Sequence, residues 1–463
     1  MRRLSLFFVV FTLIALTIPA FALSGDVKAD FDEFVRNIRE EKRIDQIGYL
    51  VLAKLAPSRL SEEQMLRTAG KFFYSSSEGY LTHVNFVRLE RLRKANVKYS
   101  ILDKKRLDDR SENWYMVWVE TPAQEARLRS EFEPLFTHDK TFIIRVRPED
   151  EELLNALELR YSVLDETLVP LRVPVWPSRV KAPKFDPAIA DQLTGITVSE
   201  MVTTVETLEN FKSRHVKQPG NAAAVKWLAE QFDAIDGLEV TTPEFNTSSG
   251  KLQNVVAIQK GTEDPNTVFV VCGHMDSTVS NYNFAVAPGA DDNGTGAAGV
   301  LHVARVAGKL PLPYTVIYAA FNAEEAGLLG SKALAKTLAA QNGIQFKAVL
   351  NMDMIADRDD NEVAVIGNTR SNWLIDVFKD TALAYTGLKS KTLYDSNIWY
   401  SDHSSFWNIG ASAILTIEGY PEMSKHYHKA SDLVANLEPT LMEKIARSQL
   451  AVLLTLNRAT NFN

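Results

Sequence analysis

The chain of 463 residues is longer than one small domain and predicts two to four folded units. Its composition, 46% hydrophobic and 24% charged, is typical of globular proteins with sizeable cores. The formal net charge is −7 and no long lysine or arginine run occurs. This argues against nucleic acid as the main partner, because phosphate binding leaves a basic footprint.

The first 22 residues have the pattern of a signal peptide. Two arginines precede an apolar run from Leu4 to Ile18, and the small-residue pattern Ala20-Phe21-Ala22 follows. An uncleaved anchor helix is the alternative, but the run is short for a membrane span. No other stretch is long and apolar enough to cross a bilayer. We expect a mature protein that is exported, either secreted or periplasmic.

Residues 23–166 predict a small α+β domain of repeated strand-helix-strand units. The segments 88–104 and 150–166 each show helical spacing followed by strand alternation. Strand candidates precede them within 72–84 and 142–146, and 113–120 adds another. No catalytic constellation occurs here. The region is either a structural or binding module, or a prodomain that assists folding or blocks the site.

A proline-rich linker is predicted at residues 167–187, before a catalytic domain at 188–463. Its prolines are incompatible with the interior of helices or central strands, and they are Pro170, Pro174, Pro177, Pro183 and Pro187.

The region 188–463 alternates predicted strands with predicted helices. Strands are expected at 252–258, 267–272, 314–320, 346–351, 362–366 and 412–417. Helices are expected at 219–234, 296–308, 327–341, 370–386 and 438–459. This alternation predicts an α/β domain with a mostly parallel sheet covered on both faces. The single cysteine, Cys272, lies in an apolar run and is expected to be buried rather than catalytic.

Polar residues follow several of these strands, where ligands bind in such sheets. They are His274 and Asp276 after the strand at 267–272, Glu324 and Glu325 after 314–320, and Asp353 after 346–351. Asp291 and Asp292 lie in a glycine-rich loop that opens the helix at 296–308. The segment HYHKASD supplies His426, His428 and Asp432 after the last strand.

An isolated acidic pair usually marks a solvated turn or a helix start. Here carboxylates recur at successive strand ends, with histidines at both ends of the series. So many negative charges in one cleft would repel each other, and a divalent cation relieves the repulsion. Mixed histidine and carboxylate ligands suit zinc, and two ions sharing a bridging carboxylate would use all of them.

Spacing suggests roles for several of these side chains. Asp276, two residues after His274 on an extended segment, is expected to hold the far ring nitrogen of that histidine. Asp432 is expected to orient His428 in the same way. Of the adjacent glutamates 324 and 325, one would bind metal and the other would act as general base.

The joint motif set H-x-D, G-A-D-D, N-A-E-E, N-x-D-M and H-x3-D resembles the co-catalytic di-zinc exopeptidases of the bacterial leucyl aminopeptidase type. The resemblance covers about residues 195–460 and is highly specific. It implies a three-layer α/β/α sandwich around a mixed, mostly parallel sheet, and two zinc ions per catalytic domain.

The resemblance also implies roles for individual residues. His274 and Asp353 would bind different zincs, and Asp292 would bridge both. Glu325 would join His274 or Asp353, and His428 would complete the other site, with the pairing left open. Glu324 would be the general base.

Several residues near these motifs have alternative interpretations. Some relatives carry a tyrosine flanked by a disulfide before the SDH segment, but Ile398 stands there in this cysteine-free stretch. Tyr400 is therefore either an oxyanion donor or a packing residue. Met354 and Ile355 line a substrate pocket or belong to the core. His302 is expected to be structural. His403 either supports a metal ligand, faces the substrate or is structural. His426 is a rival of the favoured His428 as metal ligand.

The sequence thus predicts an exported di-zinc aminopeptidase that removes N-terminal residues, expected to be apolar, from peptide or protein substrates with a free N-terminus. Its metal ligands would be His274, Asp292, Glu325, Asp353 and His428, with catalytic roles for Glu324 and Asp276. Two alternatives remain at this point: a glutaminyl cyclase on the same scaffold with one zinc, and a non-catalytic binding protein with a peptidase fold.

Overall fold

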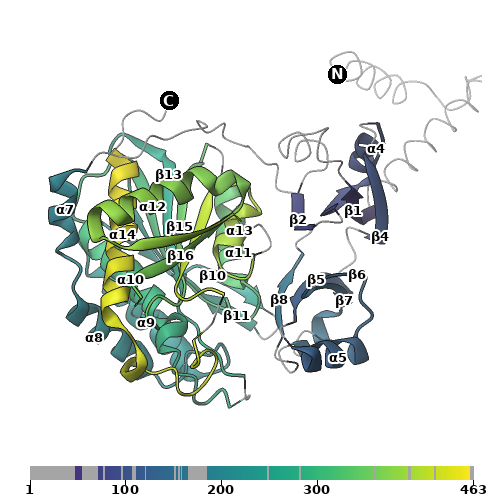
Figure 1. Ribbon diagram of the computed structural model, residues 1–463, viewed down its shortest axis with the longest axis horizontal. Coiled ribbons are helices and arrows are strands. Elements are labelled where there is room, and N and C mark those ends of the chain that lie inside the picture. Colours follow the sequence, from purple (N-terminus) through teal and green to yellow (C-terminus); the bar gives the residue numbers. More distant parts are fainter. Residues whose placement is uncertain are drawn as a thin grey trace, which may run out of the picture.

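The computed structural model describes residues 47–54, 71–76, 79–94, 97–106, 111–119, 121–150, 153–154, 157, 159–164 and 185–458, the last range apart from 248–249, 281–282, 342, 359, 395–397 and 422–423. The predicted signal peptide and most of the predicted linker lie outside the described residues. Figure 1 shows a large α/β body built from residue 185 onward beside a smaller body built from residues 47–164. No helix of the described part has both the length and the apolar character to cross a membrane.

The large body is organised around one mixed sheet, which contains eight strands within the described residues. Their order is β17 (Lys389–Tyr394), β16 (Glu362–Gly367), β18 (Ala413–Ile417), β15 (Gln345–Met352), β13 (Asp264–His274), β14 (Tyr314–Phe321), β12 (Val255–Gln259) and β9 (Glu239–Thr241). β13 is parallel to β14 and β15, β15 to β18, and β16 to β17. β12 is antiparallel to β14 and β9, and β16 to β18.

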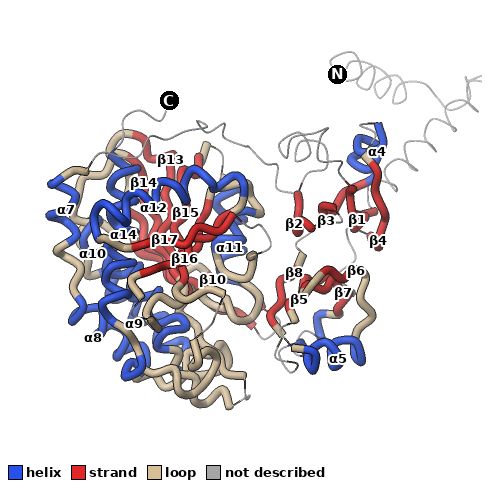
Figure 2. The backbone as a smooth tube through the Cα atoms, viewed as in Figure 1, coloured by secondary structure: helices blue, strands red, loops and turns tan. Residues whose placement is uncertain are grey.

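Helices cover both faces of this sheet, as Figure 2 shows. One face shares its core with α7 (Pro187–Leu193), α8 (Val198–Glu209), α9 (Pro219–Asp233), α10 (Gly296–Ala307), α12 (Asn372–Thr386) and α14 (Pro439–Arg458). The other face packs against α11 (Leu329–Ala340) and α13 (His403–Trp407). The predicted three-layer α/β/α sandwich is confirmed.

The central strand β13 shows why the sequence folds this way. Its run at 268–272, VFVVC, is continuously apolar because both faces of the strand are buried. Phe269 and Val271 join the core under α10, whereas Val270 and Cys272 join the core under α11. Cys272 is fully buried, as predicted.

The structure departs from the predicted elements at a few positions. The stretch 252–258 forms two strands, because the Asn254 side chain donates to Gly330 O and accepts from Asn322 N between them. Its first part is β11 (Gly250–Gln253), a hairpin partner of β10 (Glu244–Thr247). Pro187, assigned to the linker, instead begins α7 with Asp186 as its cap, since proline suits the first helical turn.

The small body contains two four-stranded antiparallel sheets in its described part. The first has the order β2 (Lys71–Ser76), β3 (Gly79–Asn85), β1 (Ile47–Lys54) and β4 (Lys98–Arg106), with α4 (Phe86–Lys94) on one face. The second has β6 (Phe136–His138), β7 (Thr141–Val146), β5 (Asn113–Trp118) and β8 (Arg160–Val163), with α5 (Pro122–Glu131). A shared apolar cluster joins the two sheets. The predicted α+β character is confirmed, although the single strand expected within 72–84 is the hairpin β2–β3.

His302 on α10 gives a testable prediction for stability. It is buried, and its Nε2 lies 2.9 Å from Thr204 Oγ1. Burial, with Arg305 nearby, lowers its pKa from 6.5 to about 4. Between those values the unfolded chain binds the proton and the folded chain does not, so stability falls as the pH falls. In urea unfolding, we expect the free energy of unfolding to fall by about 1.4 kcal/mol for each pH unit below the unfolded pKa of His302. The variant His302→Gln should lack this part of the pH dependence.

The comparison is between unfolding midpoints at pH 7 and pH 5 for both proteins. Equal pH dependence in the variant and the wild type would refute this assignment.

Candidate metal centre

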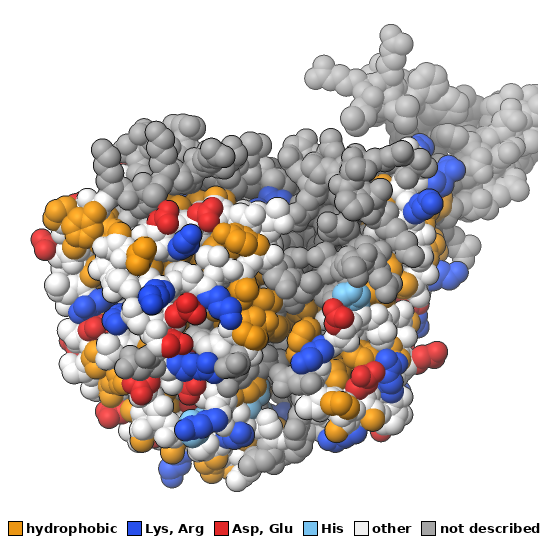
Figure 3. All heavy atoms as spheres, in the orientation of Figure 1, with side chains coloured by type: hydrophobic (Ala, Val, Ile, Leu, Met, Phe, Trp, Pro, Cys, Tyr) orange, Lys and Arg blue, Asp and Glu red, His pale blue; other side chains and the backbone are white. Residues whose placement is uncertain are grey.

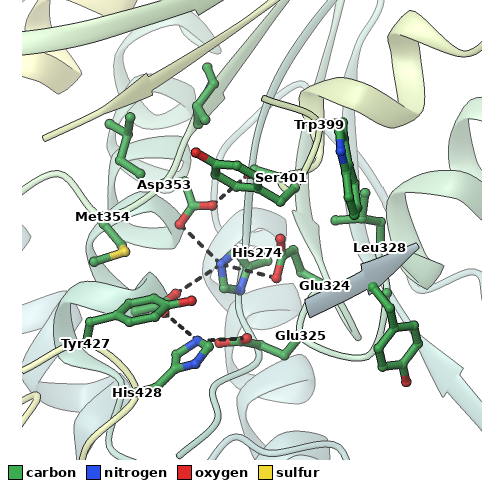
Figure 4. A pocket seen from close by; sticks show the side chains of 16 residues that line it. His274, Glu324, Glu325, Leu328, Asp353, Met354, Trp399, Ser401, Tyr427 and His428 are labelled. Atoms are coloured by element: carbon green, nitrogen blue, oxygen red, sulfur yellow. Dashed lines mark hydrogen bonds and ion pairs between the residues drawn. The ribbon is translucent and has the colours of Figure 1, made fainter. Parts of the chain in front are cut away.

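The predicted site residues gather at one edge of the sheet. β13 ends at His274, β14 is followed by Glu324 and Glu325, and Asp353 follows β15. Because β15, β13 and β14 are neighbouring parallel strands, their carboxyl ends meet at this edge. Figure 4 shows these side chains converging on a common space, with His428 arriving from the loop after β18.

Asp292 lies at the centre of this cluster. Its Oδ1 is 3.3 Å from His274 Nε2, and its Oδ2 is 3.2 Å from His428 Nε2. On one side, Asp353 Oδ1 is 3.3 Å from His274 Nε2. On the other side, Glu325 Oε2 is 3.1 Å from His428 Nε2. The geometry therefore forms two histidine–carboxylate pairs that share Asp292.

This arrangement corrects one expectation and resolves another. The resemblance placed His274 and Asp353 at different ions, but the structure places them together. The pairing of Glu325 with His428, which the sequence left open, is direct. Each of the two carboxylate oxygens of Asp292 faces a different histidine.

Glu324 lies beside these pairs without a direct ion pair to His428. Its Oε2 is 4.0 Å from His274 Nε2, and ligand atoms of Glu324, His274 and Asp353 lie within 4.8 Å of one another. Burial raises the pKa of Glu324 well above its ordinary value, and Glu325 and Asp353 add to this rise against the opposing effect of His274. Such a carboxyl group holds a proton readily.

The histidines are surrounded by negative charge. Burial alone would lower their pKa values, because it disfavours the imidazolium. The nearby carboxylates outweigh burial: the pKa of His274 lies well above its ordinary value, and that of His428 rises to about 9, chiefly through Glu325. The cluster thus has a strong requirement for positive charge.

Asp276 positions the two glutamates as well as His274. Its Oδ1 and Oδ2 accept hydrogen bonds from the backbone N–H groups of Glu324 and Glu325, at 3.1 and 3.2 Å. His274 Nδ1 lies 3.1 Å from the Asp276 backbone oxygen and 3.5 Å from its carboxylate. The side chain expected to orient one histidine therefore also fixes the turn that carries the general-base candidate.

The expected role of Asp432 is wrong. Its carboxylate accepts from the backbone N–H groups of Asp291 and Asp292, at 2.8 and 3.0 Å, and so holds the loop rather than His428. The chain turns at His428, where φ is +52°, and this directs Asp432 under the loop. His426, the rival ligand, is directed to Ser431 Oγ at 2.9 Å.

Sequence reasoning missed two residues that support the site. The fully buried Arg214 donates to the backbone oxygens of Met275, Pro288 and Gly289, which flank the segments carrying His274 and Asp292. Its position between α8 and α9 has no periodicity that would have revealed it.

The second residue is Ser401, at the start of the SDH segment. Its hydroxyl donates to Asp353 Oδ2 at 2.7 Å and accepts from Asn351 Nδ2 at 2.8 Å. Its position in the motif was the available signal.

The remaining candidates separate into pocket and core. Met354 and Tyr400 line the pocket, whereas Ile355 lies in the core between the sheet and the helices. His302 is structural, as predicted. His403 Nε2 contacts Ile398 O at 2.8 Å and its ring packs edge-on against Trp407, so it is also structural.

The donor set fits zinc. The two histidines offer imidazole nitrogens and the three carboxylates offer oxygens, the ligands that zinc takes in catalytic sites. Ligand atoms of His274, Asp292 and Glu325 lie within 4.8 Å of one another. Glu325 Oε1 is buried without a hydrogen-bond partner among the described atoms, which leaves it available to a cation.

Comparisons with known proteins agree with this geometry. Residues 254–453 match the family model described as Peptidase family M28. A "Probable zinc metalloprotease" of Pyricularia oryzae is 36% identical over 172 residues, which cover 33% of this chain and 34% of the relative. A "Probable leucine aminopeptidase" of Trichophyton verrucosum is 28% identical over 277 residues, covering 56% of this chain and 70% of the relative.

A solved structure shows the same fold. The crystal structure of the Legionella pneumophila LapA aminopeptidase aligns with a TM-score of 0.62 and 18% identity, covering 76% of this chain and 100% of that chain. The chain spans between about a third and a half of the first curated relatives that it matches.

Ser401 provides a prediction for metal binding. Ser401→Ala removes the hydrogen bond that fixes Asp353 Oδ2, and we expect the affinity for zinc to fall about tenfold or more. Zinc dissociation constants are measured by competition with a chromogenic chelator. Ser405→Ala is the matched control, because it removes a buried hydroxyl that pairs with Ser331 Oγ at 2.8 Å. Equal losses in both variants would contradict a specific role for Ser401.

Proposed function

We propose that this protein is a zinc aminopeptidase that releases N-terminal residues from peptides, and the match of residues 254–453 to the model of Peptidase family M28 supports this proposal. The observation that carries the proposal is the pair of histidine–carboxylate groups joined by Asp292, with Glu324 beside them. The relatives named as leucine aminopeptidases support peptide substrates.

Two zinc ions would be held by the two groups. His274 and Asp353 would hold one ion, Glu325 and His428 would hold the other, and Asp292 would bridge them. Bound zinc supplies Lewis acidity, which polarises a carbonyl group and acidifies water. The support for two ions is that each oxygen of Asp292 faces a separate histidine.

Glu324 is proposed as the general base. It would take a proton from the attacking water and return it to the leaving amine. Its position suits this role, because its carboxylate lies beside His274 and Asp353, at the edge of the proposed metal site. Asp276 fixes the backbone of Glu324 and so keeps its carboxylate directed at the site.

We propose that the enzyme prefers peptide substrates whose N-terminal residue is apolar. Beside the charged cluster lie Met354, Leu415, Ile417, Tyr400 and Tyr427, which line the pocket. Met354, Leu415 and Ile417 belong to one apolar cluster, and Tyr400 and Tyr427 pack against it. The carboxylates at the other side of the pocket would bind the free α-amine of the substrate. Because this contact requires a free N-terminus, it would restrict cleavage to the first peptide bond, as in an aminopeptidase.

The activity is tested with purified full chain and aminoacyl-p-nitroanilides. We expect hydrolysis that a zinc chelator abolishes and added zinc restores, with leucyl above aspartyl and lysyl substrates and no cleavage of N-acetyl-leucyl-p-nitroanilide. Glu324→Gln removes the base and is expected to lower kcat about 100-fold or more while zinc content is retained.

Glu239→Gln, at an exposed position on the edge strand β9, is the matched control and should leave kcat unchanged. Chelator-insensitive hydrolysis, or full activity in Glu324→Gln, would overturn the proposed function.

We further propose that the protein is exported and that residues 23–166 form a prodomain, joined to the catalytic domain by residues 167–187. The charged start, apolar run and Ala20-Phe21-Ala22 pattern support export. N-terminal sequencing of protein from the extracytoplasmic fraction is expected to begin near Leu23. An intact Met1 on that protein would contradict cleavage.

A further inference from the structure

One wall of the candidate active-site pocket comes from the small N-terminal body. Tyr161 on β8 lines the pocket together with Gly327, Leu328, Trp399 and Tyr400 of the catalytic domain. Its side chain is 5% exposed. Figure 4 shows a strand in the blue of the N-terminal region beside Leu328, close to Glu324.

The strand β8 contacts the loop that carries the catalytic glutamates. A Cβ on Gly327 would lie 3.2 Å from the Tyr161 ring and 3.3 Å from the Tyr161 carbonyl oxygen. Lys332 Nζ donates to Val163 O at 3.2 Å and to Gly327 O at 3.0 Å, which ties β8 to the same loop. This loop connects β14 to α11 and carries Glu324, Glu325 and Gly327.

A second contact covers the loop that holds Ser401. Trp399, only 4% exposed, belongs to the apolar core between the two N-terminal sheets, where it joins Leu50 and Trp114. The ring of Tyr400 lies 6.1 Å from that of Trp118. The pocket mouth is therefore packed by aromatic side chains from both bodies.

The space that remains is too small for a substrate. The cavity in front of the site has a volume of about 50 Å³, which accommodates a few waters at roughly 10–15 Å³ each. Pockets that take small-molecule ligands measure roughly 300–1,000 Å³. With Tyr161 and the other lining residues in these positions, the cavity leaves no room for an amino-acid side chain.

We propose that the N-terminal domain is a built-in inhibitor that closes the active site with Tyr161 and must move away before a peptide enters. This inference rests on the proposed function, because it concerns access to the same site. Among the described residues, the closing contacts include the Tyr161–Gly327 contact, the Lys332 hydrogen bond to β8, and the aromatic cluster at Trp399 and Tyr400.

The test uses the zinc-loaded full chain. Tyr161→Ala empties the position in the pocket, and we expect kcat/KM for leucyl-p-nitroanilide to rise about tenfold or more. Tyr161→Phe keeps the ring and should behave as the wild type. Tyr394→Ala, at a tyrosine 51% exposed on β17, is the control for loss of an aromatic side chain elsewhere.

A second variant guards against disruption of the N-terminal core. Lys332→Met, on α11 of the catalytic domain, keeps the alkyl chain but loses the hydrogen bonds to Val163 O and Gly327 O that tie β8 to the loop. We expect a rise in kcat/KM of about threefold. Unchanged or lowered kcat/KM in both Tyr161→Ala and Lys332→Met would overturn the inference.

A readout independent of catalysis separates this inference from the proposed function. The rate at which dipicolinate removes zinc from the full chain is expected to rise about tenfold in Tyr161→Ala and to stay unchanged in Tyr161→Phe. Equal rates in all variants would refute closure of the site. Faster removal without hydrolysis by any variant would support closure and refute the aminopeptidase proposal.

Discussion

The close approach of buried carboxylates around Asp292 is the constraint on which the rest of the structure depends. Both Asp292 oxygens face imidazole nitrogens, and these contacts hold the pKa of its carboxyl group below the ordinary range against the effect of burial. Burying a charge without a partner is costly. The neighbouring Glu325 and Asp353 add further negative charge, so the cluster requires protons or cations. This requirement explains why the site suits divalent metal.

Backbone N–H groups, more than side-chain ion pairs, hold the supporting carboxylates. Asp276 accepts hydrogen bonds from the backbone N–H groups of Glu324 and Glu325, and Asp432 accepts them from those of Asp291 and Asp292. Arg214 holds backbone carbonyl groups instead, because its guanidinium donates to the oxygens of Met275 and Gly289. Burial lowers the pKa of Arg214 to about 10, so the side chain remains charged at neutral pH. Each of these side chains fixes a short segment rather than a single ligand.

The sheet and the site edge were predictable because they depend on local pattern. The run at 268–272, VFVVC, is continuously apolar, so its burial on both faces follows from sequence. The polar residues come directly after the strands, so their convergence follows from parallel pairing. Charge is interspersed on the face seen in Figure 3, which agrees with the absence of basic runs in the sequence.

The errors concern contacts that spacing does not encode. Asp432 lies four residues from His428, but a left-handed backbone conformation at His428 turns it to a loop 140 residues away. His274 and Asp353 come from neighbouring strands, and register rather than motif order brings them together. Arg214 and Tyr161 act through segments far apart in the chain, and nothing in their local sequence marks them.

The contacts of the N-terminal domain fall on the two loops that organise the metal centre. The loop at Gly327 follows Glu324 and Glu325, and the loop at Trp399 leads into Ser401, which holds Asp353. A domain seated on these loops covers the pocket and also restrains the segments that carry its chemistry. Apolar and aromatic packing contributes more of the closing contact than the Lys332 hydrogen bond does, so the closed state depends mainly on surface burial, and salt should affect it little. The charged centre and its cover are thus stabilised by different forces, which allows the cover to move without dismantling the ligand set.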